Sequence, residues 1–304
     1  MSKNQVAIIE KNIVDNVTNR VREFQRNGEL VFPENYIPEN ALKSAYLMLQ
    51  ETQDKDKKPV LQTCTKPSIA NALLSMVVQG LNPEKKQCYF IPYGNKLVLH
   101  RSYFGAMHVA KTVDPNIQDI YGMTVYEGDE FEYEIKHGKY VVTLHKQKLQ
   151  NIHKDKIVAA YGTILYKDGR EISEVLTIDQ IKQAWKQSAM KPVDEKGNIK
   201  AGSTHDKFTA DMAEKTAINK VCKYVINSSS DTSIVVQFAK KLDSEIAEAE
   251  TQAIIEENAN QELLDFDTED VIEADAEVVD VEPIKEDKPK KEPEQIIIDE
   301  GPGY

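Results

Sequence analysis

The chain has 304 residues, enough for one large domain or two smaller ones with a buried core. No run of 18 apolar residues could cross a membrane, no apolar stretch near the start is typical of a signal peptide, and three widely spaced cysteines argue against a disulfide framework, so we expect a cytosolic protein. The net charge of −12 is uneven: residues 241–304 hold 22 acidic residues against 5 lysines, or −17, which leaves +5 for the remainder. A mildly basic body permits nucleic-acid binding without requiring it.

Apolar residues at helical spacing, together with capping residues, predict helices in both halves of the chain. The predicted helices of the first half lie within 1–30, at 39–53, from Ser68 as N-cap to Gly80, and at 103–112 after a Ser102 cap. In the second half, Thr177 and Gln180 form a capping-box pattern for a helix that ends near Met190. The last two predicted helices cover 206–226 and 233–249.

Strands are predicted where alternating apolar residues flank turn-forming residues. The segments 88–91 and 97–99 form one such hairpin, and two more are expected within 117–176 around the turns 136–139 and 167–170. Strands and helices do not alternate regularly, which argues against a parallel nucleotide-binding sheet. We therefore expect an α+β fold, with an antiparallel sheet of hairpins packed on helices and a disordered acidic C-terminal tail.

Motifs of common catalytic sites are missing from the sequence. It contains no G-x-x-x-x-G-K-[ST] or G-x-G-x-x-G loop for nucleotide phosphates, no G-x-S-x-G nucleophile motif and no histidine and cysteine spacing typical of a metal site. We therefore expect no enzyme activity and no cofactor. The alternative is a metal-dependent nuclease, since carboxylates beside a lysine can bind a divalent ion and a water. That site would consist of Asp129, Glu132, Glu134 and Lys136, which could equally form an exposed strand face of mixed charge.

A basic and aromatic stretch follows the first hairpin and enters the next predicted helix. Cations spaced along a surface bind phosphates, and flat side chains add stacking on exposed bases. The N-terminus of a helix also favours phosphate. The stretch contains Tyr89, Tyr93, Asn95, Lys96, Arg101, Tyr103, Phe104 and Lys111, and its candidates for DNA contact are Tyr93, Asn95, Lys96, Arg101, Tyr103 and Lys111. The other interpretation, for Tyr89, Phe90 and Phe104 in particular, is core packing.

The predicted helix 206–226 has one basic and one apolar face at 100° per residue. The basic arc contains Lys215, Asn219, Lys220 and Lys223, and the apolar arc contains Ala217, Ile218, Val221, Cys222 and Val225. Lysines on a helix are often simply solvated, but no acidic residue interrupts this arc, which favours a phosphate-binding role. Glu214 falls inside the apolar arc and would need a partner if buried.

Three further cations and one tryptophan complete the predicted DNA-binding set. They are Lys66, Trp185, Lys186 and Lys207. Trp185, the only tryptophan, could stack on a base or pack against a neighbouring helix, and both interpretations are open from the sequence.

Five segments resemble the RecT family of phage single-strand annealing recombinases, which is related to Red-beta of lambda. They are Ser68-Ile69-Ala70-Asn71-Ala72-Leu73, Gly80-Leu81-Asn82-Pro83, Tyr89-Phe90-Ile91-Pro92-Tyr93, Tyr103-Phe104-Gly105-Ala106-Met107 and Met212-Ala213-Glu214-Lys215-Thr216-Ala217-Ile218-Asn219-Lys220. The likeness extends over roughly residues 30–240 in matching order. Two positions depart from the family pattern: Glu214 stands where a basic residue is expected, and Asn219 where arginine is common.

The resemblance implies a protein that binds single-stranded DNA, anneals it to a complement without ATP and retains the annealed duplex in a homo-oligomeric ring or helical filament. It also implies that an acidic C-terminal region contacts a single-strand-binding protein or a phage exonuclease. The candidate segment here is Gln295-Ile296-Ile297-Ile298-Asp299, and the alternative is a tail that only keeps the protein soluble. We accordingly expect residues 1–30 to make subunit contacts, 31–250 to form the DNA-binding and oligomerisation core, and 251–304 to be a partner-binding tail.

Overall fold

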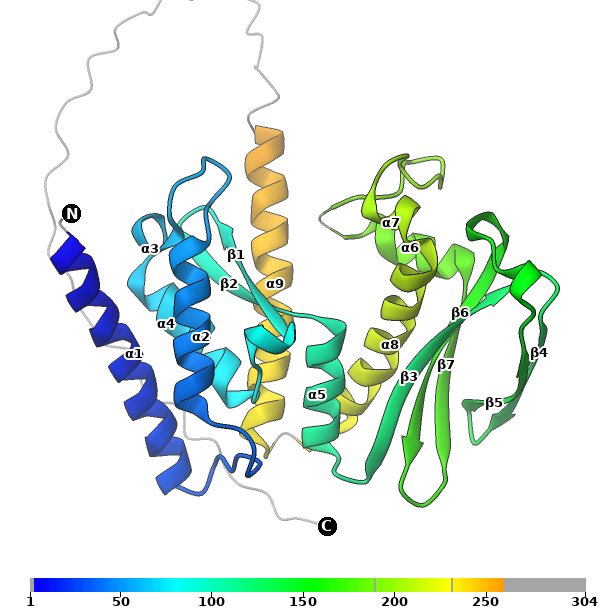
Figure 1. The fold of residues 1–304 in the computed structure, drawn as a ribbon, viewed down its shortest axis with the longest axis horizontal. Helices are drawn as coiled ribbons and strands as arrows, with labels where there is room; N and C mark the ends of the chain where they lie inside the picture. Colours follow the sequence, from blue (N-terminus) through cyan, green and yellow to red (C-terminus); the bar gives the residue numbers. More distant parts are fainter. Residues whose placement is uncertain (1–2, 189, 231, 260–304) are drawn as a thin grey trace, which may run out of the picture. The chain divides into compact units, whose positions relative to one another are not determined.

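The structure is a computed structural model that describes residues 3–188, 190–230 and 232–259 (Figure 1). Its first elements are α1 (Lys3–Arg26), α2 (Pro38–Glu51), α3 (Val60–Thr63), α4 (Lys66–Val78), the 3₁₀ turn η1 (Pro83–Lys85), β1 (Cys88–Tyr93), β2 (Lys96–Arg101) and α5 (Tyr103–Val113). The sheet region follows with β3 (Ile117–Tyr126), β4 (Glu130–Lys136), β5 (Lys139–Lys146), the 3₁₀ turns η2 (Leu149–Asn151) and η3 (Lys154–Lys156), β6 (Ile157–Tyr166) and β7 (Glu171–Thr177). The last are α6 (Ile178–Lys186), α7 (Thr204–Lys207), α8 (Thr209–Ser228) and α9 (Ile234–Ala259). The predicted α+β class is confirmed.

Helix α4 lies at the centre of the first half, and Leu73 and Met76 on it have no exposed surface. Its N-cap is Thr65, whose hydroxyl oxygen accepts a hydrogen bond from the Ser68 backbone N–H at 3.4 Å. The prediction of Ser68 as the cap is therefore wrong by one turn. The Ser68 hydroxyl instead accepts from the Leu97 backbone N–H at 3.1 Å, which ties α4 to β2. One apolar core joins this helix to side chains of α1, α2, α5, α8 and α9.

The sheet has the strand order β3-β6-β7-β5-β4, with antiparallel neighbours throughout. The two predicted hairpins are confirmed as β4–β5 and β6–β7. In the first, Lys136 pairs with Lys139, so only His137 and Gly138 form the loop, and both have positive φ (51° and 74°). Two such residues match the right-handed twist of the flanking strands, which is why short hairpins use them.

Helix α8 packs on this sheet and also contacts α5, α6 and α9, so it joins the sheet to the helical part (Figure 1). Gly122 on β3 and Gly162 on β6 pair directly beneath it. A Cβ atom on Gly162 would lie 2.7 Å from the carbonyl oxygen of Ala217, and one on Gly122 would lie 2.9 Å from Cγ1 of Ile218. The absence of both side chains lets the backbone of α8 approach the strands closely.

We expect Gly162→Ala to lower the free energy of unfolding by about 1–3 kcal/mol, because the added methyl group meets backbone that cannot rotate away. Gly122→Ala should cost less, since its methyl group meets the side chain of Ile218, which can change rotamer. Urea denaturation of the two variants measures the difference. Equal losses would contradict the backbone explanation.

The second half contains the predicted helices with shifted ends. The capping box at Thr177 and Gln180 is confirmed at the start of α6. The helix predicted at 206–226 is divided into α7 and α8, and the helix predicted to end at 249 continues as α9 to Ala259. The remainder of the predicted acidic tail lies outside the described residues. In the part of the chain that the structure describes, no helix is long and apolar enough to cross a membrane.

Candidate nucleic-acid interface

Helix α8 separates its apolar and polar faces as the sequence predicts. Ala217, Val221 and Cys222 have no exposed surface. Asn219, Lys220 and Lys223 are exposed and Lys215 is half-buried. Because Lys215, Asn219 and Lys223 are spaced by four residues, they form one ridge along the helix. We call Lys215, Asn219, Lys220 and Lys223 the α8 row.

The sequence predicts that Glu214 needs a partner if it is buried, and the structure shows that this partner is on β3. Its Oε1 atom accepts hydrogen bonds from the backbone N–H of Thr124 at 3.0 Å and from the Thr124 hydroxyl at 3.1 Å. Burial raises the pKa of Glu214, against the opposing effect of these two bonds. The carboxylate therefore anchors α8 to the sheet and does not face the α8 row.

Each end of the α8 row meets another element. Lys215 Nζ lies 5.6 Å from the ring centroid of Tyr103, at the start of α5. Lys220 Nζ is 3.9 Å from Glu174 Oε2 on β7, and Lys223 Nζ is 3.5 Å from Asp243 Oδ2 on α9. Both lysines are more than half exposed, with 54% and 61% of their side-chain surface open to solvent, whereas Glu174 and Asp243 are only 19% and 28% exposed. Because an ammonium group has three donors, each lysine can contact a phosphate on its solvent side while its carboxylate partner stays in place.

A shallow hollow of about 460 Å³ borders the row and is lined by Glu174, Lys220, Lys223, Tyr224, Asn227 and Ser228. Lys139 of β5 lies over its edge, with Nζ 3.4 Å from the centroid of the Tyr224 ring. The α8 row thus has an aromatic ring and a further cation beside it.

Arg101 is not available to phosphate in this structure. Its side chain is only 10% exposed. The guanidinium donates to Gln79 Oε1 at 2.7 Å and to Asp243 Oδ1 at 2.8 Å. Asp243 on α9 therefore joins Arg101 of β2 to Lys223 of α8. Arg101 therefore holds β2, α9 and the C-terminal end of α4 together and is not among the residues that we propose to contact DNA.

The predicted residues at the turn between β1 and β2, together with Lys66, form a second group, which we call the turn group. The Thr65 backbone N–H donates to the Asn95 carbonyl oxygen at 2.9 Å, which brings Lys66 next to Asn95 and Lys96. These residues are exposed, whereas Tyr93 is half-buried with its hydroxyl 3.2 Å from His100 Nε2. Because a strand rises about 3.4 Å per residue, this turn group lies about 17 Å from the Arg101 end of β2.

The remaining predicted residues do not join either group. Trp185 is buried, donates from Nε1 to the Thr216 hydroxyl at 2.8 Å and meets the His205 ring edge-on, so it packs against neighbouring helices and does not present its ring to a base. Lys186 and Lys207 are exposed on α6 and α7. Lys111 Nζ lies 3.0 Å from Asp119 Oδ1.

The residues of the nuclease alternative are not arranged as a metal site. The side chain of Asp129 has no exposed surface, and its carboxylate accepts from the Tyr126 backbone N–H and from the side chains of His145, Gln147 and Asn151. Burial alone would raise the pKa of Asp129, but these hydrogen bonds outweigh it and lower the pKa to about 2. Glu132 and Glu134 lie on exposed β4, with Glu134 paired to Lys136 at 2.8 Å. Among the described residues, no three histidine, cysteine or acidic side chains are grouped to bind a metal.

The sequence model of the RecT family matches residues 39–262, about three quarters of the chain. The chain belongs to the RecT family. Members of this family are single-strand annealing proteins of DNA recombination, so the predicted family, DNA binding and annealing function are confirmed at that level. No curated protein matches the chain significantly.

Of the three aromatic residues for which the sequence left core packing open, only one is core in this RecT-family protein. Phe90 is core, as one interpretation held, but Tyr89 is 48% exposed and Phe104 is 43% exposed. Strand alternation around buried Cys88 and Phe90 could have placed Tyr89 outward. Helical spacing could likewise have placed Phe104 opposite Ala106, Val109 and Ala110, the buried residues of α5. No sequence signal indicates that Lys139 meets Tyr224.

Proposed function

We propose that this RecT-family protein binds single-stranded DNA along the α8 row and the start of α5, and anneals it to a complementary strand without ATP. The observation that carries the proposal is the contact of Lys215 with Tyr103. It joins a row of exposed cations on α8 to an aromatic residue at a helix N-terminus. Cations and rings in one continuous surface are what sequence-tolerant binding of single strands requires.

The energy for annealing comes from the DNA. Each correct base-pair step adds stacking of about 1.4 kcal/mol, so a strand whose base edges are open can test a complement and keep it without nucleotide hydrolysis. The protein supplies charge neutralisation and geometry. This agrees with a sequence that has no phosphate-binding loop for ATP.

We further propose that subunits assemble as a homo-oligomeric ring or helical filament, with residues 1–30 in the subunit contacts. In the described part of α1, Val17, Val21 and Phe24 pack into the chain's own core, so a contact would use the opposite, polar face. Side-by-side α8 rows would make many weak phosphate contacts act together.

The acidic region beyond the described residues is our proposed contact for a single-strand-binding protein or a phage exonuclease.

A fluorescence assay with complementary oligonucleotides, one carrying a fluorophore and the other a quencher, tests the proposal. We expect the protein to accelerate annealing well above the spontaneous rate, equally with and without ATP. The same labelled strands incubated with Mg²⁺ should keep their length. An unchanged annealing rate would end the proposal, and shortened strands would support the nuclease alternative.

A further inference from the structure

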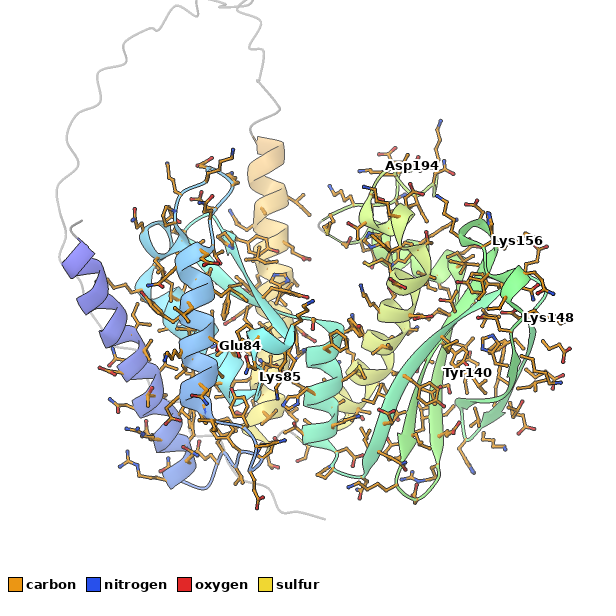
Figure 2. All side chains as sticks on the ribbon, viewed as in Figure 1. Glu84, Lys85, Tyr140, Lys148, Lys156 and Asp194 are labelled. Carbon is orange, nitrogen blue, oxygen red and sulfur yellow. The ribbon has the colours of Figure 1, made fainter. Side chains whose placement is uncertain are left out.

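A groove outside the α8 row lies between η1 and α5. It is lined by Lys85, Gln87, Phe104, Met107, His108 and Lys111 and has a volume of about 260 Å³. Figure 2 labels Lys85 on η1, beside α5. Since one water occupies about 30 Å³ of liquid, the groove has room for roughly nine waters, the scale of one small ring system and not of a folded element. We call it the α5 groove.

The floor of the α5 groove is fixed before any ligand binds. The Gln87 carbonyl oxygen accepts from the Ser102 backbone N–H at 3.0 Å, and its side-chain Oε1 accepts from the Asn82 backbone N–H at 2.9 Å. A Cβ atom on Gly105 would lie only 2.1 Å from the Gln87 carbonyl oxygen, so the first turn of α5 can sit this close only with glycine there. A preformed groove loses little conformational entropy on binding.

The Phe104 ring lines one side of the α5 groove and is not part of the buried core. Its ring touches Tyr103, with centroids 4.0 Å apart, yet the residue is 43% exposed and lines the groove. The core side of α5 is made by other residues, among them Ala106, Val109 and Ala110. An exposed ring backed by a second ring is suited to stacking against a third flat group.

The charge beside the Phe104 ring is positive. Burial lowers the pKa of His108, so this side chain is neutral at pH 7 and the lysines supply the cations. Lys85 is exposed, and Lys111 is paired with Asp119 while 37% of its side chain and 58% of that of Asp119 remain open to solvent. Such a pair is weak, and a phosphate can compete with Asp119 for Lys111.

We propose that the α5 groove takes one unstacked nucleobase of the bound strand per subunit, with Phe104 stacking on the base and with Lys85 and Lys111 contacting the flanking phosphates. This inference rests on the proposed function. It explains a preference for single strands, because bases in a duplex are stacked on each other and cannot enter. A stacked base is worth about 1–3 kcal/mol, comparable to the 1.4 kcal/mol of one pairing step, so the base can leave the groove when its complement arrives.

Binding of a short oligothymidylate and of an abasic strand of the same length tests this inference. We expect Phe104→Leu to weaken oligothymidylate binding about tenfold per subunit. Binding of the abasic strand should be unchanged, because that strand has no base to stack on Phe104. Phe104→Tyr keeps the ring and should keep the affinity. The matched control is Tyr133→Leu, which removes a ring of similar exposure (46%) from β4 and should change nothing.

Two further readouts separate stacking from charge and from misfolding. The dependence of affinity on salt should be unchanged in Phe104→Leu, whereas Lys85→Ala, on an exposed turn, should reduce the slope of log affinity against log salt by about 0.7. If Phe104→Leu binds both strands like the unaltered protein, or loses affinity for both equally, the inference is overturned while the proposed function stands. If the unaltered protein binds neither strand, the proposed function itself fails.

Discussion

Alanine at Lys215, Lys220 and Lys223 together is expected to weaken single-strand binding about 100-fold at 0.1 M salt. Each lost phosphate contact removes about 0.7 from the slope of log affinity against log salt, so three contacts account for about two orders of magnitude between 1 M and 0.1 M salt. The three lysines share the polar face of α8 and none is fully buried, so the fold should tolerate their removal. Fluorescence anisotropy of a labelled oligonucleotide across a salt series gives both affinity and slope.

The matched control removes three positive charges at positions outside α8. Lys148, Lys156 and Lys167 are exposed in loops at the ends of the sheet strands, and Figure 2 labels the first two. Alanine at these three positions should leave the slope within about 0.7 of the unaltered value. If the two triple variants lose affinity equally, binding follows net charge alone, and the α8 row has no special role.

Asp129→Ala is expected to lower the free energy of unfolding by about 3–5 kcal/mol, the largest stability loss that we predict. The carboxylate is completely buried and accepts four hydrogen bonds from the last residue of β3, β5, the residue that follows β5, and η2. Alanine would leave all four donors without their acceptor. Chemical denaturation monitored by circular dichroism measures the loss, and a loss below about 1 kcal/mol, within the range of a surface substitution, would contradict this role.

The same carboxylate predicts a pH dependence. The pKa of Asp129 is about 2 in the folded protein, below the usual value of 3.8 for an unfolded aspartate. A lowered pKa means that the stabilisation is complete above about pH 4 and is lost as the pH falls through about 2. Asp129→Asn, which cannot ionise, should lack this component, so the stability curves of the two proteins should converge in acid. Parallel curves from pH 6 to pH 2 would assign the acid sensitivity to other groups.

Local sequence patterns determined the elements of this protein and their faces. The capping box at Thr177, the two-residue loop of β4–β5 and the apolar arc of α8 depend on residues within a few positions of each other, which is why they can be read directly. The order and spacing of short segments was also sufficient to recognise the RecT family. The solvent-facing lysines of α8 follow from the same helical period.

Tertiary structure decided which of the candidate residues are free to meet a ligand. Arg101 and Asp243 are 142 positions apart, and their ion pair buries a cation that looked available for phosphate. The indole of Trp185 donates a hydrogen bond to Thr216, which is 31 positions away in the sequence. Glu214 accepts a hydrogen bond from Thr124, which is 90 positions away. The helical or strand period predicts which face of an element a residue occupies. It does not predict which residues of other elements pack against that face. Because burial and pairing arise from packing between distant segments, only the tertiary structure shows that Lys85 of η1 lies beside Phe104 and Lys111 of α5.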